Sequence, residues 1–135
     1  MRTLLVPVDG SPPSVRAVEH VRETYPDDRI VLLTVVDPVD GFAGAEAAEG
    51  NWHESTARQA EAMLADHADS VGEVITVETA VRTGSPAETI LAAVSEFDAD
   101  AVVVGSHGRR GIGRLLLGSV AETTAREASV PVTIV

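Results

Sequence analysis

A glycine-rich segment at residues 105–119 holds the residues of this chain that are best suited to chemistry. It reads Gly-Ser-His-Gly-Arg-Arg-Gly-Ile-Gly-Arg-Leu-Leu-Leu-Gly-Ser and contains five glycines. An apolar run precedes it, and a helix-like stretch opens at Ser119. The N–H groups at a helix start lack intrahelical acceptors, and the helix dipole attracts anions there. Glycine lets the backbone approach a ligand with no Cβ in the way. The segment therefore predicts a phosphate-binding loop.

The spacing of its glycines separates this loop from two common phosphate motifs. The chain has no lysine to reach a β- or γ-phosphate, and Gly-x-Gly-x-x-Gly does not follow the first strand-like run. The order is instead Gly105, two residues, Gly108, nine residues, then Gly118-Ser119. A Walker A loop and a Rossmann fingerprint are therefore both excluded.

Three of the ten arginines of the chain lie in this loop, namely Arg109, Arg110 and Arg114. They form the one basic spot of an acidic chain. Guanidinium groups bind phosphate oxygens in forked geometry, so these arginines could balance a triphosphate. They could equally be solvated and paired with neighbouring carboxylates.

The length and composition of the chain limit which classes of protein it can belong to. A length of 135 residues suits one domain, which we expect to span 1–135, and 44% hydrophobic residues are enough for a core. No cysteine is present, which excludes disulfides and thiolate chemistry. No apolar run approaches the roughly 20 residues of a membrane span, and the N-terminus lacks a signal-peptide layout. We expect a cytoplasmic protein.

The charge is strongly acidic, at −11, and all ten basic residues are arginine. Such a chain repels nucleic acid and anionic lipid, so neither is an expected partner. Lysine-free acidic chains are typical of halophiles, in which molar salt shortens the Debye length to about 3 Å. The alternative is an acidic protein from a GC-rich mesophile.

Strand and helix patterns alternate along the chain. Apolar or β-branched runs at 3–8, 30–36, 74–81, 101–104 and 130–135 predict strands, and the continuous runs among them are typical of parallel strands buried on both faces. Helical spacing fills the gaps. Ser11 is an expected N-cap, and Ser85 and Ser119 each precede a Glu by three residues, as in capping boxes. With right-handed crossovers the pattern predicts an α/β three-layer sandwich around a five-stranded parallel sheet.

Ligands of open α/β sheets bind beyond the carboxyl ends of the strands. In this chain small or acidic residues stand there, at Asp9, Asp37, Gly84 and Gly105. The connection at 37–50 could be a surface loop or a lid. No histidine has a partner at metal-ligand spacing, so we expect no metal held by protein ligands.

The linked motifs resemble the universal stress protein family along the whole chain. They are Leu-Val-Pro-Val-Asp-Gly-Ser at the start, Gly-Ser-Pro-Ala at 84–87, Asp-Ala-Val-Val-Val-Gly-Ser-His-Gly at 100–108, Gly-Ser-Val-Ala at 118–121 and Val-Pro-Val at 130–132. The glycine spacing matches that of the family's ATP-binding branch. The resemblance implies the strand order 3-2-1-4-5 and an ATP site.

The resemblance also implies roles for individual residues. Asp9 would meet the ribose, while Pro7 and Val36 would line the adenine pocket. Contacts to ribose and the first phosphates would come from Val104, Gly105, His107 and Gly108, and contacts to the β- and γ-phosphates from Gly118, Ser119 and Val120. Mg²⁺ or Mn²⁺ would be carried on the phosphates.

The last strand-like run, at 130–135, has no charged residue. An apolar edge strand tends to pair unless it is covered, and family members dimerise through this strand. The resemblance therefore implies a homodimer.

We expect a regulatory stress-response protein that binds ATP and hydrolyses it slowly or not at all. No His–carboxylate pair activates Ser106 or Ser119 as a nucleophile. Two alternatives stay open, namely an interaction protein that binds no nucleotide and a slow ATP-hydrolysing enzyme.

Overall fold

A computed structural model describes residues 1–38, 52–72, 76–106 and 117–135, with no side-chain detail at 52–55. Strands and helices alternate in the order β1 (Thr3–Pro7), α1 (Pro12–Thr24), β2 (Arg29–Val36), α2 (Trp52–Val71), β3 (Val77–Thr83), α3 (Pro86–Glu96), β4 (Ala101–Val104), α4 (Ser119–Glu127) and β5 (Val132–Ile134). The expected alternation is confirmed. His107, Gly108 and the three loop arginines lie outside the described residues, as does most of the connection at 37–50.

The strands form one parallel sheet in the order β3-β2-β1-β4-β5. This confirms the predicted five-stranded α/β fold and its strand order. The winding direction reverses between β1 and β4, which are neighbours in the sheet but lie nearly a hundred residues apart in sequence.

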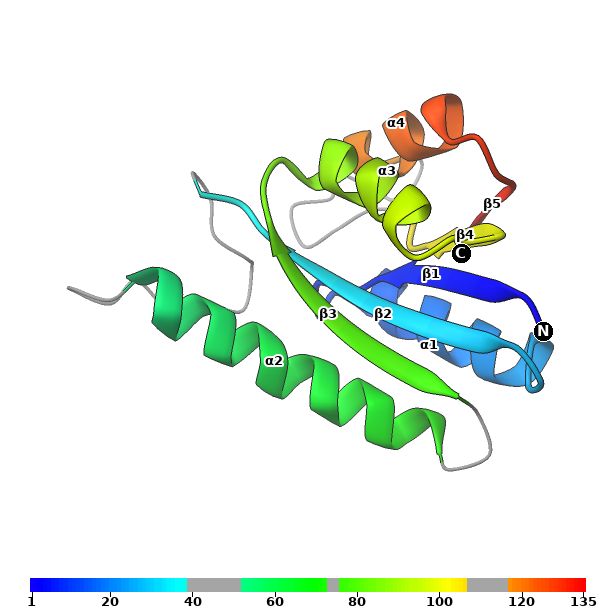
Figure 1. The fold of residues 1–135 in the computed structure, drawn as a ribbon, viewed down its shortest axis with the longest axis horizontal. Coiled ribbons are helices and arrows are strands. Elements are labelled where there is room, and N and C mark those ends of the chain that lie inside the picture. Colours follow the sequence, from blue (N-terminus) through cyan, green and yellow to red (C-terminus); the bar gives the residue numbers. More distant parts are fainter. Residues whose placement is uncertain (39–51, 73–75, 107–116) are drawn as a thin grey trace.

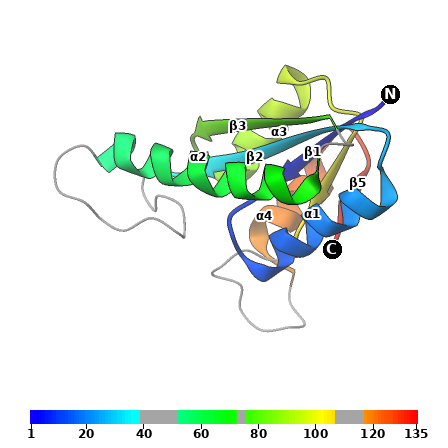
Figure 2. The ribbon, with the colours of Figure 1, turned by 90° about the horizontal axis from the view of Figure 1, so that it is seen from below.

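Two helices cover each face of the sheet, which gives three layers (Figure 1). α1 and α2 lie on one face, nearest the viewer in Figure 2, and pack on alternate sheet residues such as Leu4, Val6 and Ile30. α3 and α4 lie on the other face and pack on residues such as Leu5 and Val31. The central strands bury both faces, which explains why their sequences are apolar without alternation.

Three hydrogen bonds to side-chain carboxylates help to hold the start of β1. The Asp28 carboxylate accepts hydrogen bonds from the Arg2 backbone N–H at 3.1 Å and from the Arg2 guanidinium at 3.0 Å. The Asp100 carboxylate accepts one from the Thr3 N–H at 2.8 Å. β1 is thereby tied to the loops on both sides of it.

Two predicted strands differ from the observed ones by two residues or more at an end, while β1 and β2 differ by one residue. β3 extends to Thr83, two residues beyond the predicted end at 81, because its hydrogen-bonded register with β2 continues through Arg82 and Thr83. As an edge strand it tolerates these polar residues. β5 covers only Val132–Ile134 of the predicted run at 130–135.

The cap predicted for α4 is wrong by one residue. Gly118, with φ −65° and ψ 152°, is the N-cap, and Ser119 is the first helical residue. The Gly118 N–H donates to the Ser106 carbonyl at 2.7 Å, which holds Gly118 in an extended conformation just before the helix. The Ser-x-x-Glu spacing at 119–122 therefore begins inside the helix and makes no capping box.

Candidate functional site

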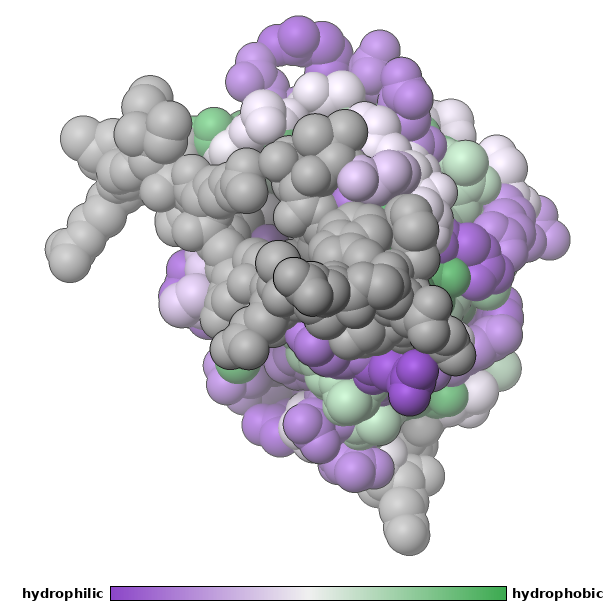
Figure 3. All heavy atoms as spheres, turned by 90° about the vertical axis from the view of Figure 1, so that its left-hand side faces the viewer, coloured by the Kyte–Doolittle hydropathy of each residue, from purple (hydrophilic) through white to green (hydrophobic). Residues whose placement is uncertain are grey.

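The carboxyl ends of the five parallel strands meet along one edge of the sheet, and those of β2 and β3 point to the left in Figure 1. Figure 3 views the molecule from that side, where the described residues around the rim are mostly hydrophilic with single hydrophobic residues among them. Since β1 and β4 are neighbours, the residues that follow them lie next to one another at the reversal of winding. A crevice at this position is the usual ligand site of open α/β sheets.

The turn after β1 is tightly organised. The Asp9 carboxylate is half-buried and accepts a hydrogen bond from the Ser11 N–H at 2.9 Å. Gly10 has φ +80°, a left-handed conformation that glycine adopts freely. A Cβ at Gly10 would lie 3.1 Å from the Met63 sulfur, so this turn lies directly against α2. One carboxylate oxygen of Asp9 thus orders the turn.

The side chain of Val36, at the end of β2, is only 2% exposed and packs with Ala60 of α2. Its carbonyl accepts a hydrogen bond from the Gly84 N–H at 3.0 Å, which joins the ends of β2 and β3. Val104, at the end of β4, is also buried and packs in the core beneath α3 and α4. Both valines therefore present backbone rather than side chain to the edge.

Gly105 is in van der Waals contact with the start of α1. A Cβ built on it would lie 2.8 Å from the Pro13 carbonyl carbon and 2.9 Å from the Ser14 nitrogen. Those are backbone atoms, which cannot move aside as a flexible side chain does. The absence of a side chain at Gly105 is thus required by the packing of β4 on α1.

The start of α4 lies at the same edge. Helix geometry leaves the N–H groups of Ser119, Val120 and Ala121 without intrahelical acceptors, and Ser119 is exposed. Glu122 is the first residue whose N–H donates within the helix, to the Gly118 carbonyl at 2.9 Å. The helix start can therefore donate several hydrogen bonds to an anion.

The structure brings most of the predicted site residues to this one edge. Pro7 ends β1 and Asp9 follows it, and Val104 and Gly105 lie beside them at the end of β4. The Gly118–Ser106 hydrogen bond brings Gly118, Ser119 and Val120 to the same place. Val36 stands one strand away on the other side of β1. Sequence reasoning missed the backbone role of Ser106, because residue type carries no signal for which main-chain groups will pair.

No group of three or more His, Cys, Asp or Glu side chains in the described part of the chain could hold a metal ion. Within the same ranges, none of the helices has the length and apolar character needed to cross a membrane.

This fold and this edge define a doubly wound α/β protein with a candidate anion site at the reversal of winding. The model of the universal stress protein family matches residues 1–135. Universal stress protein MJ0531 of Methanocaldococcus jannaschii is 31% identical to this chain, and the match covers 99% of this chain and 81% of that protein. The chain belongs to the universal stress protein family.

Solved structures agree with this assignment. That of the hypothetical protein MJ0577, whose sequence is from the same organism, superposes with a TM-score of 0.83 at 26% identity and covers 99% of this chain and 94% of its own. A universal stress protein in complex with cAMP superposes at 0.68 with 24% identity, covering 99% and 96%. A family protein from Arabidopsis thaliana with AMP bound superposes at 0.69 with 21% identity, covering 100% and 91%.

Proposed function

We propose that this protein binds ATP at the carboxyl edge of its sheet and acts as a regulatory stress-response module. The observation that carries the proposal is the position of the α4 N-terminus, which the Gly118–Ser106 hydrogen bond holds beside the end of β4 at the reversal of winding. The glycine spacing of the ATP-binding branch supports it, as do the relatives with cAMP and AMP bound.

Each end of the nucleotide would meet a different part of the edge. The triphosphate would accept hydrogen bonds from the N–H groups at Gly118, Ser119 and Val120, where the helix dipole also favours negative charge. The ribose would meet the Asp9 carboxylate oxygen that does not accept from Ser11. Val36 and Val104 would contribute backbone groups, since their side chains are buried.

The residues at the edge fit a nucleotide that brings its own metal. Among the residues that the structure describes, they offer hydrogen-bond donors for phosphate oxygens rather than a cluster of carboxylates for a cation. Mg²⁺ or Mn²⁺ would be bound by the phosphates and neutralise part of their charge. The predicted contacts of Gly105, His107 and Gly108 with the ribose and first phosphates belong to the same proposal.

The test is thermal unfolding with and without ATP and Mg²⁺. A ligand at a hundred times its Kd stabilises a protein by about 2.7 kcal/mol, which shifts the midpoint upward by several degrees. Gly118→Val places a branched side chain at the helix start and should abolish the shift. Ala125→Val, at an exposed position of the same helix, should leave the shift intact and serves as the control.

A protein that shows no shift with ATP, ADP or AMP would instead be an interaction protein that binds no nucleotide. Release of phosphate during the incubation would make it a slow ATPase. Survival of ATP binding in Gly118→Val would overturn the placement of the phosphates at α4.

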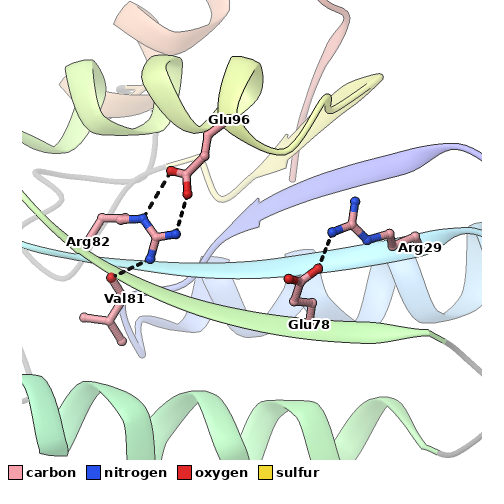
Figure 4. A network of polar contacts seen from close by, with 5 residues as sticks. All are labelled: Arg29, Glu78, Val81, Arg82 and Glu96. Carbon is pink, nitrogen blue, oxygen red and sulfur yellow. Dashed lines mark hydrogen bonds and ion pairs between the residues drawn. The ribbon is translucent and has the colours of Figure 1, made fainter.

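The two edges of the sheet differ in a way that supports a homodimer through β5. β3 carries two charged residues in ion pairs, Glu78 with Arg29 of β2 and Arg82 with Glu96 of α3 (Figure 4). Such charges discourage edge-to-edge pairing. β5 has none, and Ile134 is 38% exposed. We infer that two copies pair along β5.

Sedimentation analysis of two lysine variants tests this pairing. Ile134→Lys puts a charge into the proposed interface and should yield monomers. Thr79→Lys, at an exposed position of the opposite edge strand, should leave the dimer intact. Monomeric wild-type protein at all concentrations would overturn the proposed dimer.

A further inference from the structure

The backbone of Ser106 connects two parts of the molecule that are not in sequence contact. Its N–H donates to the Val135 carbonyl at 2.7 Å, just beyond β5, and its carbonyl accepts from the Gly118 N–H at 2.7 Å, at the cap of α4. The Val135 N–H in turn donates to the Val104 carbonyl at 2.9 Å. One residue thus joins the end of the edge strand to the start of the helix.

Ser106 is also held by the residue before it. Gly105 lies against the backbone of Pro13 and Ser14, where even a Cβ would not fit, so the chain has no room to move toward α1. Two further constraints on the Ser106 backbone are its hydrogen bonds to Val135 and Gly118. If Val135 becomes less mobile, the Ser106 backbone becomes less mobile with it, and so does Gly118.

We propose that Ser106 is a positioning residue that couples the nucleotide site to the pairing of β5 with a second copy of the chain. This inference rests on the proposed function, because it assigns a regulation to that same site. Pairing of two β5 strands orders Val135, Val135 holds the Ser106 N–H, and the Ser106 carbonyl holds Gly118 in the cap geometry that exposes the α4 N–H groups.

Coupling of this kind is reciprocal. If the start of α4 is better ordered in the dimer, the ATP affinity of each site in the dimer exceeds that of the monomer by about 5-fold or more. With two sites in the dimer, saturating ATP then lowers the dimer dissociation constant by the square of that factor, about 25-fold or more.

The first experiment measures ATP affinity of the wild-type protein at concentrations below and above the midpoint of dimer formation. The expected result is tighter binding above the midpoint, together with a lower dimer dissociation constant in saturating ATP. Equal affinities in monomer and dimer would overturn the coupling while leaving ATP binding intact. Absence of ATP binding at every concentration would instead contradict the proposed function itself, and the coupling with it.

Two variants at Ser106 isolate the main-chain bond. Ser106→Pro removes the N–H that donates to Val135, whereas Ser106→Ala keeps that N–H and removes only the hydroxyl. The proline variant should bind ATP with the same affinity at all protein concentrations, while the alanine variant should keep the wild-type dependence. Equal concentration dependence in both variants would contradict a role for the Ser106 N–H.

Hydrogen exchange provides a measurement that needs no substitution. The Gly118 N–H lies outside β5, so a purely local interface would leave its exchange rate unchanged on dimer formation. Coupling predicts slower exchange of this amide as the protein concentration rises, without nucleotide present. An exchange rate that is independent of concentration across the dimer midpoint would overturn the proposal even where the proline variant fails to fold.

Discussion

Glycine residues of the loop have different roles, although the sequence presents them as one motif. Position 105 requires glycine because it lies against α1. A Cβ added there would lie closest to atoms of Pro13 and Ser14. Gly118 has φ −65°, which any residue can adopt, so its backbone does not require glycine. Its role comes from its position as the N-cap of α4. Glycine at position 105 therefore serves the fold irrespective of any ligand.

Gly105→Ala should destabilise the protein by about 1–3 kcal/mol, because the added methyl group forces β4 and α1 apart. Urea unfolding of the variant and the wild type measures the difference. Unchanged stability together with weaker ATP binding would show that the position serves the ligand rather than the packing.

Two buried threonines illustrate how the same residue type can stabilise or destabilise. The Thr34 hydroxyl donates to the Val8 carbonyl at 2.9 Å and helps to hold the turn after β1. Thr124, on α4, is fully buried, and its hydroxyl has no hydrogen-bond partner in the described structure. A buried hydroxyl without a partner carries an uncompensated desolvation cost.

Replacing each threonine by valine, which has nearly the same shape, should therefore have opposite effects. Thr124→Val should raise the free energy of unfolding by about 1 kcal/mol, and Thr34→Val should lower it by a similar amount. Chemical denaturation of the two variants in parallel gives both values. Destabilisation by Thr124→Val would mean that its hydroxyl is hydrogen-bonded in solution.

Helix caps show what sequence patterns establish at the level of elements and what they leave open. Ser11 and Ser85 both precede proline and a helix, and both are N-caps as predicted. The Ser11 hydroxyl accepts from the Ser14 N–H at 3.3 Å, whereas the Ser85 side chain makes no capping hydrogen bond. The backbone at the two caps differs in ψ, 156° against 130°, and no residue pattern encodes that difference.

Ser11→Ala should cost about 1 kcal/mol of stability, since it leaves a buried N–H without its acceptor. Ser85→Ala should cost clearly less, because no hydrogen bond is lost. Thermal unfolding of the two variants, side by side, measures the contrast. Equal losses would indicate that Ser85 also caps its helix in solution.

The order and type of the elements were predictable because the apolar runs and helical stripes are strong and well separated. The bounds of the strands were less predictable. At Thr83, for example, pairing with β2 rather than hydrophobicity sets the end of β3. At the candidate site, sequence indicated the residues at the strand ends. It could not indicate that Val36 and Val104 turn their side chains into the core, which depends on how α2, α3 and α4 pack.

Acidic residues gather near the carboxyl end of α2, where the Arg22 guanidinium of α1 supplies a cationic contact by donating to the Ser70 carbonyl at 3.3 Å. α2 has no basic residue in its last turn, where the helix dipole favours cations, and Asp66 and Asp69 are both exposed near that end. They stand three residues apart on the same helix, a spacing at which like charges repel. Salt screens both effects.

We predict that stability rises as the KCl concentration is increased from about 0.1 M to about 2 M, and that Asp66→Asn with Asp69→Asn reduces this dependence. In low salt the double variant should be more stable than the wild type by about 0.5–1 kcal/mol, and in high salt the two should converge. Thermal unfolding across the salt series provides the comparison. A salt response that is the same in both proteins would point to general salting-out instead.

The central position of β1 also has a consequence for the order in which the molecule folds. Of the five strands of this sheet β1 is synthesised first, and β2, some twenty residues later, can pair with one of its edges early. Its other edge must wait for Ala101 and Val102, and the Thr3 N–H must wait for Asp100. Until then a nascent chain presents the unpaired edge of a largely apolar strand, the kind of surface that chaperones bind. Refolding from denaturant should accordingly be limited by the late docking of the β4–α4–β5 segment onto a preformed N-terminal half.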